Sequence, residues 1–236
     1  MNRILLERSN KESIDIVKDT NMLIKDELNY KYVFNVYNSN LNLLILKENS
    51  NDVSYEFNIY GGNVSVNNIS YSSLNLSIVV NLNKEYSNIT IHNSLISTNN
   101  QICDVKINHN SKLTNSYVYN NGVTKMEGSI IFNVSSYAKK GSYKSIINQD
   151  SKIINLNKTS NNVINPILLI DEYDTESRHS AFIGNFKDDT LFYLMSRGLS
   201  KIDASKLLID GLLIGTLDID SREKEKIRKL FIVDRG

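Results

Sequence analysis

Apolar and polar residues alternate along much of the chain before residue 160, and this period of two constrains the fold more than any other feature. In the clearest example the alternate positions are Leu74, Leu76, Ile78, Val80 and Leu82. A period of two places successive side chains on opposite faces of a β-strand. Similar segments recur from about residue 30 to about residue 156, with short Asn, Ser or Gly interruptions. The chain is therefore predicted to be mainly β.

Many short strands in series are compatible with a sandwich, a barrel or a β-solenoid. Two observations favour the solenoid. First, the segments are irregular copies of one another. Second, the chain has few of the Asn-Gly or Asp-Gly dipeptides that tight hairpins prefer, and Asn121-Gly122 is an exception. Residues 4–30 are ambiguous between helix and strand, and we interpret them as strands.

Asparagine marks a boundary in the chain. Of 34 asparagines, 33 lie at or before Asn165. The side chain of Asn can bond the backbone of a turn and tolerates a left-handed conformation, which suits the turns between stacked rungs. The abrupt stop after Asn165 indicates that the architecture changes there.

The tail is predicted to be helical. Ile167–Ile170 indicates one last strand, buried on both faces, followed by an acidic segment. A first helix begins near Asp188 and ends at Gly198 in a left-handed cap, and Ser200 and Ser221 begin two more. In the second helix Ile202, Ala204, Leu207 and Leu208 are expected to share one face. We predict a β-helix core over 1–185, with 1–30 uncertain, and a helical subdomain over 186–236 that docks on its own strands or on a partner.

Bulk properties exclude several classes of partner. The net charge of +1 supplies no basic excess for nucleic acid or an anionic membrane. Cys103 is the only cysteine, so neither an intrachain disulfide nor a Cys-based zinc site is expected. The N-terminus lacks the apolar run of a signal peptide, and we expect a cytoplasmic protein.

Catalytic signatures are missing from the sequence. A nucleophilic triad would need His92, His109 or His179 as its base, and none lies in a recognisable context for that chemistry. The sequence has neither a Walker A loop nor a GxGxxG motif. The chain is therefore not expected to be an enzyme.

The remaining candidate residues have mostly structural interpretations. Cys103 alternates in step with Val105 and Ile107, so on a strand it faces the same side as they do. It is expected to be a small buried hydrophobe. His92 is expected on a solvated surface, and His109 in a turn. His179 follows Asp171, Glu172, Asp174 and Glu176 on a predicted connection. Two interpretations of it stay open: a metal ligand, or a side chain packed on Phe182 beside a solvated acidic turn.

One ordered set of motifs resembles a known family. His179, Ser180, Ala181 and Gly184 are followed by Asp188, Leu191–Leu194, Ser196–Ser200, Ala204, Leu207 and Leu208. This order, with LFYL-x-SRG-L-S after a histidine segment, looks like the C-terminal signature of the SufB/SufD family of iron–sulfur cluster assembly proteins.

The resemblance implies a right-handed parallel β-helix with a small C-terminal helical subdomain. It also implies a non-catalytic scaffold subunit that pairs with a SufB-type subunit and docks a SufC-type ATPase within a SufBCD complex. No cofactor would be bound permanently, but an iron–sulfur cluster or iron would pass transiently through the partner interface. His179 is then the candidate site residue and metal ligand. The ATPase-docking candidates are Leu191, Phe192, Leu194, Arg197, Leu207 and Leu208.

Departures from the family pattern narrow the assignment. SufB-type chains carry a glutamate where this chain has Ser180, and a functional cysteine in the last rungs, where Ser142 to Asn165 contains none. Both departures favour a SufD-like subunit. An alternative from another class is a β-solenoid that binds or modifies carbohydrate, which would require a groove of aromatic and acidic side chains.

Overall fold

A computed structural model describes residues 3–5, 12–25, 30–47, 52–71, 74–156 and 160–229. The strands are β1 (Arg3–Leu5), β2 (Glu12–Ile16), β3 (Thr20–Lys25), β4 (Tyr30–Lys47), β5 (Asp52–Tyr71), β6 (Leu74–Leu82), β7 (Ser87–Ser97), β8 (Asn100–His109), β9 (Asn115–Thr124), β10 (Ser129–Ala138), β11 (Ser145–Asn155), β12 (Val163–Ile170) and β13 (Thr175–Gly184). The helices are α1 (Asp188–Ser196), α2 (Lys201–Leu213) and α3 (Ser221–Arg228). The prediction of a mainly β chain with a helical C-terminus is confirmed.

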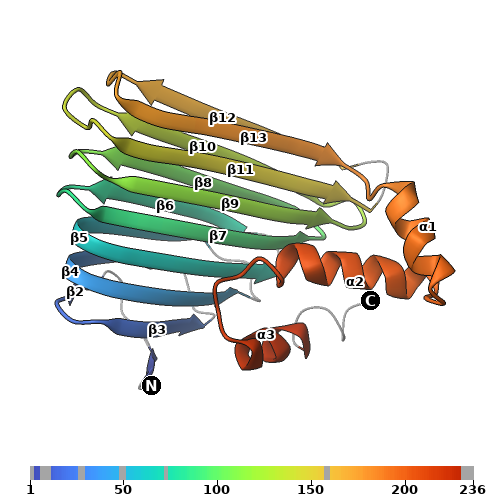
Figure 1. Cartoon of the computed structure of the whole chain (residues 1–236). Coiled ribbons are helices and arrows are strands. Elements are labelled where there is room, and N and C mark those ends of the chain that lie inside the picture. Colours follow the sequence, from blue (N-terminus) through green and yellow to red (C-terminus); the bar gives the residue numbers. More distant parts are fainter. Residues whose placement is uncertain are drawn as a thin grey trace.

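The strands form a parallel β-solenoid, as expected (Figure 1). Its first face contains β2, the N-terminal halves of β4 and β5, and then β6, β8, β10 and β12. Its second face contains β3, the C-terminal halves of β4 and β5, and then β7, β9, β11 and β13. Asn121-Gly122 lies inside β9 rather than in a hairpin.

The corner between the two faces is built from left-handed residues stacked rung upon rung. Gly61 and Gly62, which the sequence indicated as an interruption, have φ of 90° and 101°. A Cβ on Gly62 would lie 2.1 Å from the carbonyl oxygen of Ser39, so the close rung spacing requires glycine there. Higher rungs turn at Tyr86 and Leu113, and the Tyr86 N–H donates to the Leu113 carbonyl at 3.1 Å.

Asparagine ladders run along the outside of both faces. On the first face, Asn81 donates to Asn58 and Asn58 to Asn35, at 2.9 and 3.1 Å. The ladder starts at Asp15, whose carboxylate accepts from Asn35 at 2.8 Å. Asp19 starts a second ladder, through Asn40, Asn63, Asn88 and Asn115, on the second face. A carboxylate only accepts hydrogen bonds, so it fixes the direction in which every amide above it points.

The interior is an apolar column. Tyr32 stacks on Tyr55 and Phe34 on Phe57, with ring centroids 5.8 and 5.1 Å apart. These rings are joined by the inward-facing aliphatic residues of both faces, including Ile78, Val80 and Ile107. Burial of this alternating set outweighs the weak intrinsic preference of Asn-rich segments for turns.

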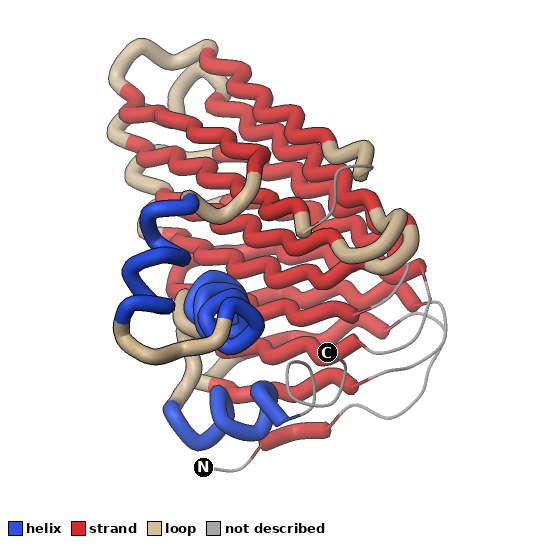
Figure 2. Tube along the Cα trace, turned by 90° about the vertical axis from the view of Figure 1, so that its right-hand side faces the viewer, coloured by secondary structure: helices blue, strands red, loops and turns tan. Residues whose placement is uncertain are grey.

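Two of the helices dock on the solenoid's own strands, beside its lower rungs (Figure 2). Ile209, Leu213 and Ile227 of α2 and α3 pack in a second cluster with the C-terminal ends of β4, β5, β7, β9 and β11. Ser94 donates to the Leu213 carbonyl at 2.7 Å, and the backbone N–H of Asp218 donates to Asn67 at 2.8 Å. None of the helices in the described part of the chain is long and apolar enough to cross a membrane.

The predicted helix starts and the stop at Gly198 are confirmed, but the predicted apolar face of α2 is wrong. Gly198 has φ +93°, and the Ser200 hydroxyl caps α2 by accepting from the Asp203 N–H at 3.1 Å. Ala204 is buried, whereas Ile202 and Leu207 are 68% and 51% exposed. The face of α2 that docks on the strands carries Ile209 and Leu213, because the helix crosses the solenoid only with its C-terminal turns.

Candidate functional site

The last rung, β12 and β13, leaves its apolar side chains in solvent. Ile167 and Leu169 of β12 are 48% and 54% exposed, and Phe182 and Ile183 of β13 are 44% and 42% exposed. The prediction that Ile167–Ile170 would be buried on both faces is therefore wrong. These two strands end the path of the sheet, and they lie at the top of the stack in Figure 1, away from α2 and α3.

His179 lies within β13, not on a connection between the last strand and the first helix as predicted. It pairs with Gln149 of β11, and the same column continues down through Val118, Ile91 and Val66. Those three apolar residues face the interior and are fully buried. His179 therefore points into the open end of the solenoid, where its side chain is exposed.

Gln149 forms the floor of this opening. Its side chain is 1% exposed. Its Nε2 donates to the Ser136 hydroxyl at 2.9 Å and to the Ile167 carbonyl at 3.2 Å, so the amide bridges the two faces. Among the described residues its Oε1 has no hydrogen-bond partner. The sequence around Gln149 gives no signal for this role, because glutamine also occurs on solvated strand faces.

The acidic segment before β13 is a structural turn. Asp171 accepts from the Tyr137 hydroxyl at 2.8 Å, and Glu172 accepts from the Gly141 N–H at 2.9 Å. Hydrogen bonds from the Gly141 and Asp174 backbone hold the pKa of Glu172 below its usual range. These acids close the last corner of the solenoid, in agreement with the solvated-turn interpretation.

The other half of that interpretation, His179 packed on Phe182, disagrees with the register. Phe182 pairs with Lys152 on the outer face, and the Lys152 ammonium lies 5.5 Å from the ring centroid. Ser180 also faces outward, where it donates to Asp150 at 2.6 Å. His179, one residue from Ser180 and three from Phe182, is on the opposite side of the strand.

Cys103 is a buried hydrophobe, as predicted. It is fully buried on β8 beside the core of the first face, and this burial raises the pKa of its thiol far above the ordinary value. A thiol held in its neutral form is a poor ligand for iron.

The interpretations of the two other histidines need correction. His109, predicted in a turn, is fully buried at the end of β8, with Nδ1 2.8 Å from the Thr114 hydroxyl and Nε2 2.9 Å from the Ser116 hydroxyl. Burial lowers its pKa to about 4. Its parity with Cys103, Val105 and Ile107 was the signal for an inward position. His92, predicted on a solvated surface, is half-buried and stacks on Tyr119 with centroids 4.9 Å apart. Burial likewise lowers its pKa.

A second candidate surface, the α1–α2 face, carries exposed apolar side chains on two helices that contact each other. Every residue of α1 is at least partly exposed, and Phe192, Leu207 and Ile202 are 65%, 51% and 68% exposed. Leu191, Leu194 and Leu208 are half-buried. The sequence analysis placed Ile202 on one helix face with Ala204, Leu207 and Leu208 but did not include it among the docking candidates.

Arg197 belongs to the edge of the α1–α2 face. Its guanidinium lies 5.3 Å from the centroid of the Tyr193 ring and donates to the Tyr193 hydroxyl at 3.4 Å. Its backbone N–H donates to the Leu194 carbonyl at 3.1 Å. The side chain therefore covers an aromatic ring on the outer surface of α1, and its charge stays in solvent.

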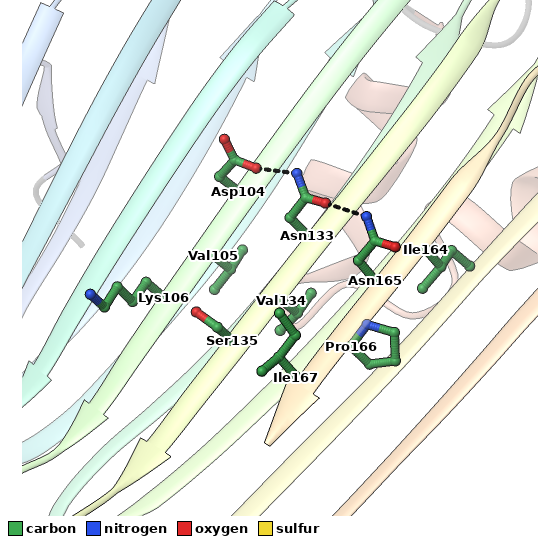
Figure 3. A pocket seen from close by; sticks show the side chains of 10 residues that line it. All are labelled: Asp104, Val105, Lys106, Asn133, Val134, Ser135, Ile164, Asn165, Pro166 and Ile167. Carbon is green, nitrogen blue, oxygen red and sulfur yellow. Dashed lines mark hydrogen bonds between the residues drawn. The ribbon is translucent and has the colours of Figure 1, made fainter. Parts of the chain in front are cut away.

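Within the described residues, no three His, Cys, Asp or Glu side chains gather in a way that could hold a metal ion. A pocket of about 590 Å³ spans β8, β10 and β12 (Figure 3). Its outward side chains include Asp104, Asn133 and Asn165, which form one short ladder, with Lys106 and Ile167 beside it. Aliphatic, amide and charged groups line it rather than the aromatic rings that a carbohydrate groove requires.

Comparison with known proteins gives one family. Residues 34–212 match the family described as "SUF system FeS cluster assembly, SufBD core domain". The chain is 35% identical over 125 residues to the iron–sulfur cluster assembly protein SufD of Bacillus subtilis, and 26% identical over 130 residues to SufD of Escherichia coli. A SufBD-family protein of Pyrococcus horikoshii is 49% identical over 45 residues.

The alignments cover limited parts of these proteins. They span 52% and 54% of this chain, but 29% and 31% of the SufD proteins of B. subtilis and E. coli. For the P. horikoshii protein the shares are 19% and 10%.

Proposed function

Because the chain belongs to the SufBD core-domain family of the SUF iron–sulfur cluster assembly system, we propose that it is a SufD-like, non-catalytic scaffold subunit of a SufBCD-type complex. Its similarity to two SufD proteins supports the choice within the family. The observation that carries the proposal is the position of His179. The residue that begins the family motif points into the open end of a solenoid whose last rung also exposes several apolar side chains.

The last rung is the proposed docking surface for a SufB-type subunit. Ile170 and Ile183 face inward at the opening and are 37% and 42% exposed, which is unusual for interior positions of a parallel solenoid. A second solenoid placed on this end would cover them and pair with the free edges of β12 and β13. Pro166 lies in β12 and removes one backbone donor from this end strand of the sheet.

His179 would face the partner's cargo, a nascent iron–sulfur cluster or iron, across this interface. A neutral imidazole nitrogen can bind iron, but most cluster ligands are thiolates. The one thiol of this chain, Cys103, is fully buried with a raised pKa. The partner subunit would therefore supply the thiolates, and this chain would contribute one histidine to a shared, transient site.

The α1–α2 face is the proposed docking surface for a SufC-type ATPase. Phe192 and Leu207 present exposed apolar groups there, with Arg197 at the edge, and aromatic and arginine side chains are enriched in protein interfaces. Because α2 is anchored to β9 and its neighbours, a force on α1 and α2 would reach the solenoid directly. Movement of the ATPase could in this way act on the scaffold.

Co-purification tests the proposal. The tagged chain, produced together with the SufB-type and SufC-type proteins of the same organism, should isolate both in stable amounts. A variant with Phe192→Ser and Leu207→Ser should lose the ATPase but keep the SufB-type partner. Recovery of the tagged chain alone, from cells that contain both other proteins, would contradict the proposed function.

A further inference from the structure

The side-chain amide of Gln149 is fixed in position directly below His179. The two residues are register partners on β11 and β13, and both face the interior. Gln149 donates to the Ser136 hydroxyl and the Ile167 carbonyl, so its amide cannot turn without losing two hydrogen bonds. The Oε1 atom is buried and, among the described residues, has no donor.

A buried acceptor without a donor is uncommon in folded proteins and needs an explanation. Register partners on neighbouring strands are about 4.8 Å apart, so the ring of His179 can reach Oε1. The adjacent inward column already bonds from rung to rung: Asn93 donates to Asn120 at 2.8 Å, and Asn120 donates to Ser151 at 3.0 Å. A bond between Gln149 and His179 would also join two rungs, in the neighbouring column and with the upper residue as the donor.

We propose that Gln149 is a positioning residue for His179, with its Oε1 accepting a hydrogen bond from Nδ1–H of the imidazole. The exposed His179 ring turns to make this bond, whereas the Gln149 amide stays where its two other bonds hold it. A proton fixed on Nδ1 leaves the lone pair of Nε2 free and directed out of the opening. The role of that lone pair toward the partner's cargo rests on the proposed function, but the hydrogen bond itself does not.

Nitrogen-detected NMR of the uniformly ¹⁵N-labelled chain, without partners, tests the proposal. In spectra recorded at about pH 8, the two ring nitrogens report which of them carries the proton. A free histidine side chain in water favours Nε2–H. We expect Nδ1–H as the major form of His179, a return to Nε2–H as the major form in Gln149→Met, and recovery of Nδ1–H in Gln149→Glu, which keeps an acceptor.

Asn148→Met is the matched control, because it removes an amide from the outer side of the same strand, where Asn148 accepts from Arg178 at 3.0 Å. It should leave the His179 tautomer unchanged. A major Nε2–H form in the unsubstituted chain, or the same tautomer ratio with and without the Gln149→Met change, would overturn the positioning role. If Gln149→Met does not fold, the wild-type spectrum still tests the proposal, because it shows whether Nδ1–H is the major form of His179. A chain with the expected tautomer that fails to co-purify with partners would contradict the proposed function alone.

Discussion

Asn81 donates its side-chain amide to Oδ1 of Asn58 at 2.9 Å, and the two residues occupy the same position of successive rungs. The link repeats above and below, with Asn108 donating to Asn81 at 2.8 Å. Such ladders use one asparagine per rung, which contributes to the enrichment before Asn165, although the solenoid itself continues to Gly184. The amides align in one direction, so each bond polarises the next.

Asn81→Ala should lower the free energy of unfolding by about 1–3 kcal/mol, because it removes two ladder bonds and leaves the Oδ1 of part-buried Asn58 without this donor and the side-chain amide of Asn108 without this acceptor. Urea unfolding followed by circular dichroism measures the change. Asn161→Ala is the control, at an exposed position outside the ladders. Equal stability of the two variants would show that the ladders contribute little.

The first acid of a ladder should tolerate substitution better than an amide within it. Asp15→Asn keeps an acceptor for Asn35, so we expect a loss of at most about 0.5 kcal/mol. Asn58→Asp places an acceptor against the Oδ1 of Asn35 and should cost about 1–2 kcal/mol more. Urea unfolding measures the change in the free energy of unfolding for each variant. Equal losses in the two variants would contradict a ladder with a fixed direction.

Acid should weaken the fold through His109. Its folded pKa of about 4 lies below the ordinary value of 6.5, because the charged form is disfavoured by burial. The folded state therefore binds the proton less readily than the unfolded state, so the stabilisation is present above about pH 6.5 and is lost as the pH falls toward 4. By pH 5 the loss is about 2 kcal/mol.

His109→Gln removes the titrating group while keeping a donor and an acceptor for Thr114 and Ser116. Urea unfolding between about pH 5 and pH 8 should show a flatter pH dependence for this variant than for the wild-type chain. If the free energy of unfolding changed equally steeply with pH in both proteins, a group other than His109 would be responsible for the pH dependence.

A charge at the open end of the solenoid should weaken partner binding when it is on the inward side of a strand but not when it is on the outward side. Ile183→Glu places a charge on the inward side of β13, and Leu169→Glu places one on the outward side of β12, at positions that are 42% and 54% exposed. Both variants should fold. Only Ile183→Glu is expected to weaken binding of the SufB-type subunit, by about tenfold or more as measured by calorimetry. A similar loss in Leu169→Glu would show that the partner covers the outer face instead.

The sequence predicted those parts of the fold in which one face of each strand is buried and therefore apolar. The alternation at Leu76, Ile78 and Val80 and the break at Gly61-Gly62 follow from packing and backbone sterics. It missed β13, because the inward residues of the last rung, such as Ser177 and His179, are covered by no further rung in the part of the chain that the structure describes and show no apolar pattern. It mistook His109 for a turn residue because its asparagine neighbours outweighed its parity.

The candidate site was only partly predictable for the same reason. The motif identified His179 and the helix residues around Phe192, but the position of His179 at the opening depends on its register with Gln149. That register is set by the preceding corner, where Tyr137 bonds Asp171 and Gly141 bonds Glu172. Contacts between residues about 30 positions apart in a solenoid leave no local pattern in the chain.

The most direct test of the account is cluster assembly by the reconstituted complex with His179→Ala. The residue is exposed, so its removal should leave the melting temperature and the recovery of both partners unchanged. Iron and acid-labile sulfide per complex, together with the visible absorbance of the cluster, are then expected to fall at least tenfold, while Ser177→Ala, the inward neighbour on β13, retains most of the signal. Normal cluster content in a stable His179→Ala complex would contradict the central claim that this histidine serves the assembly site.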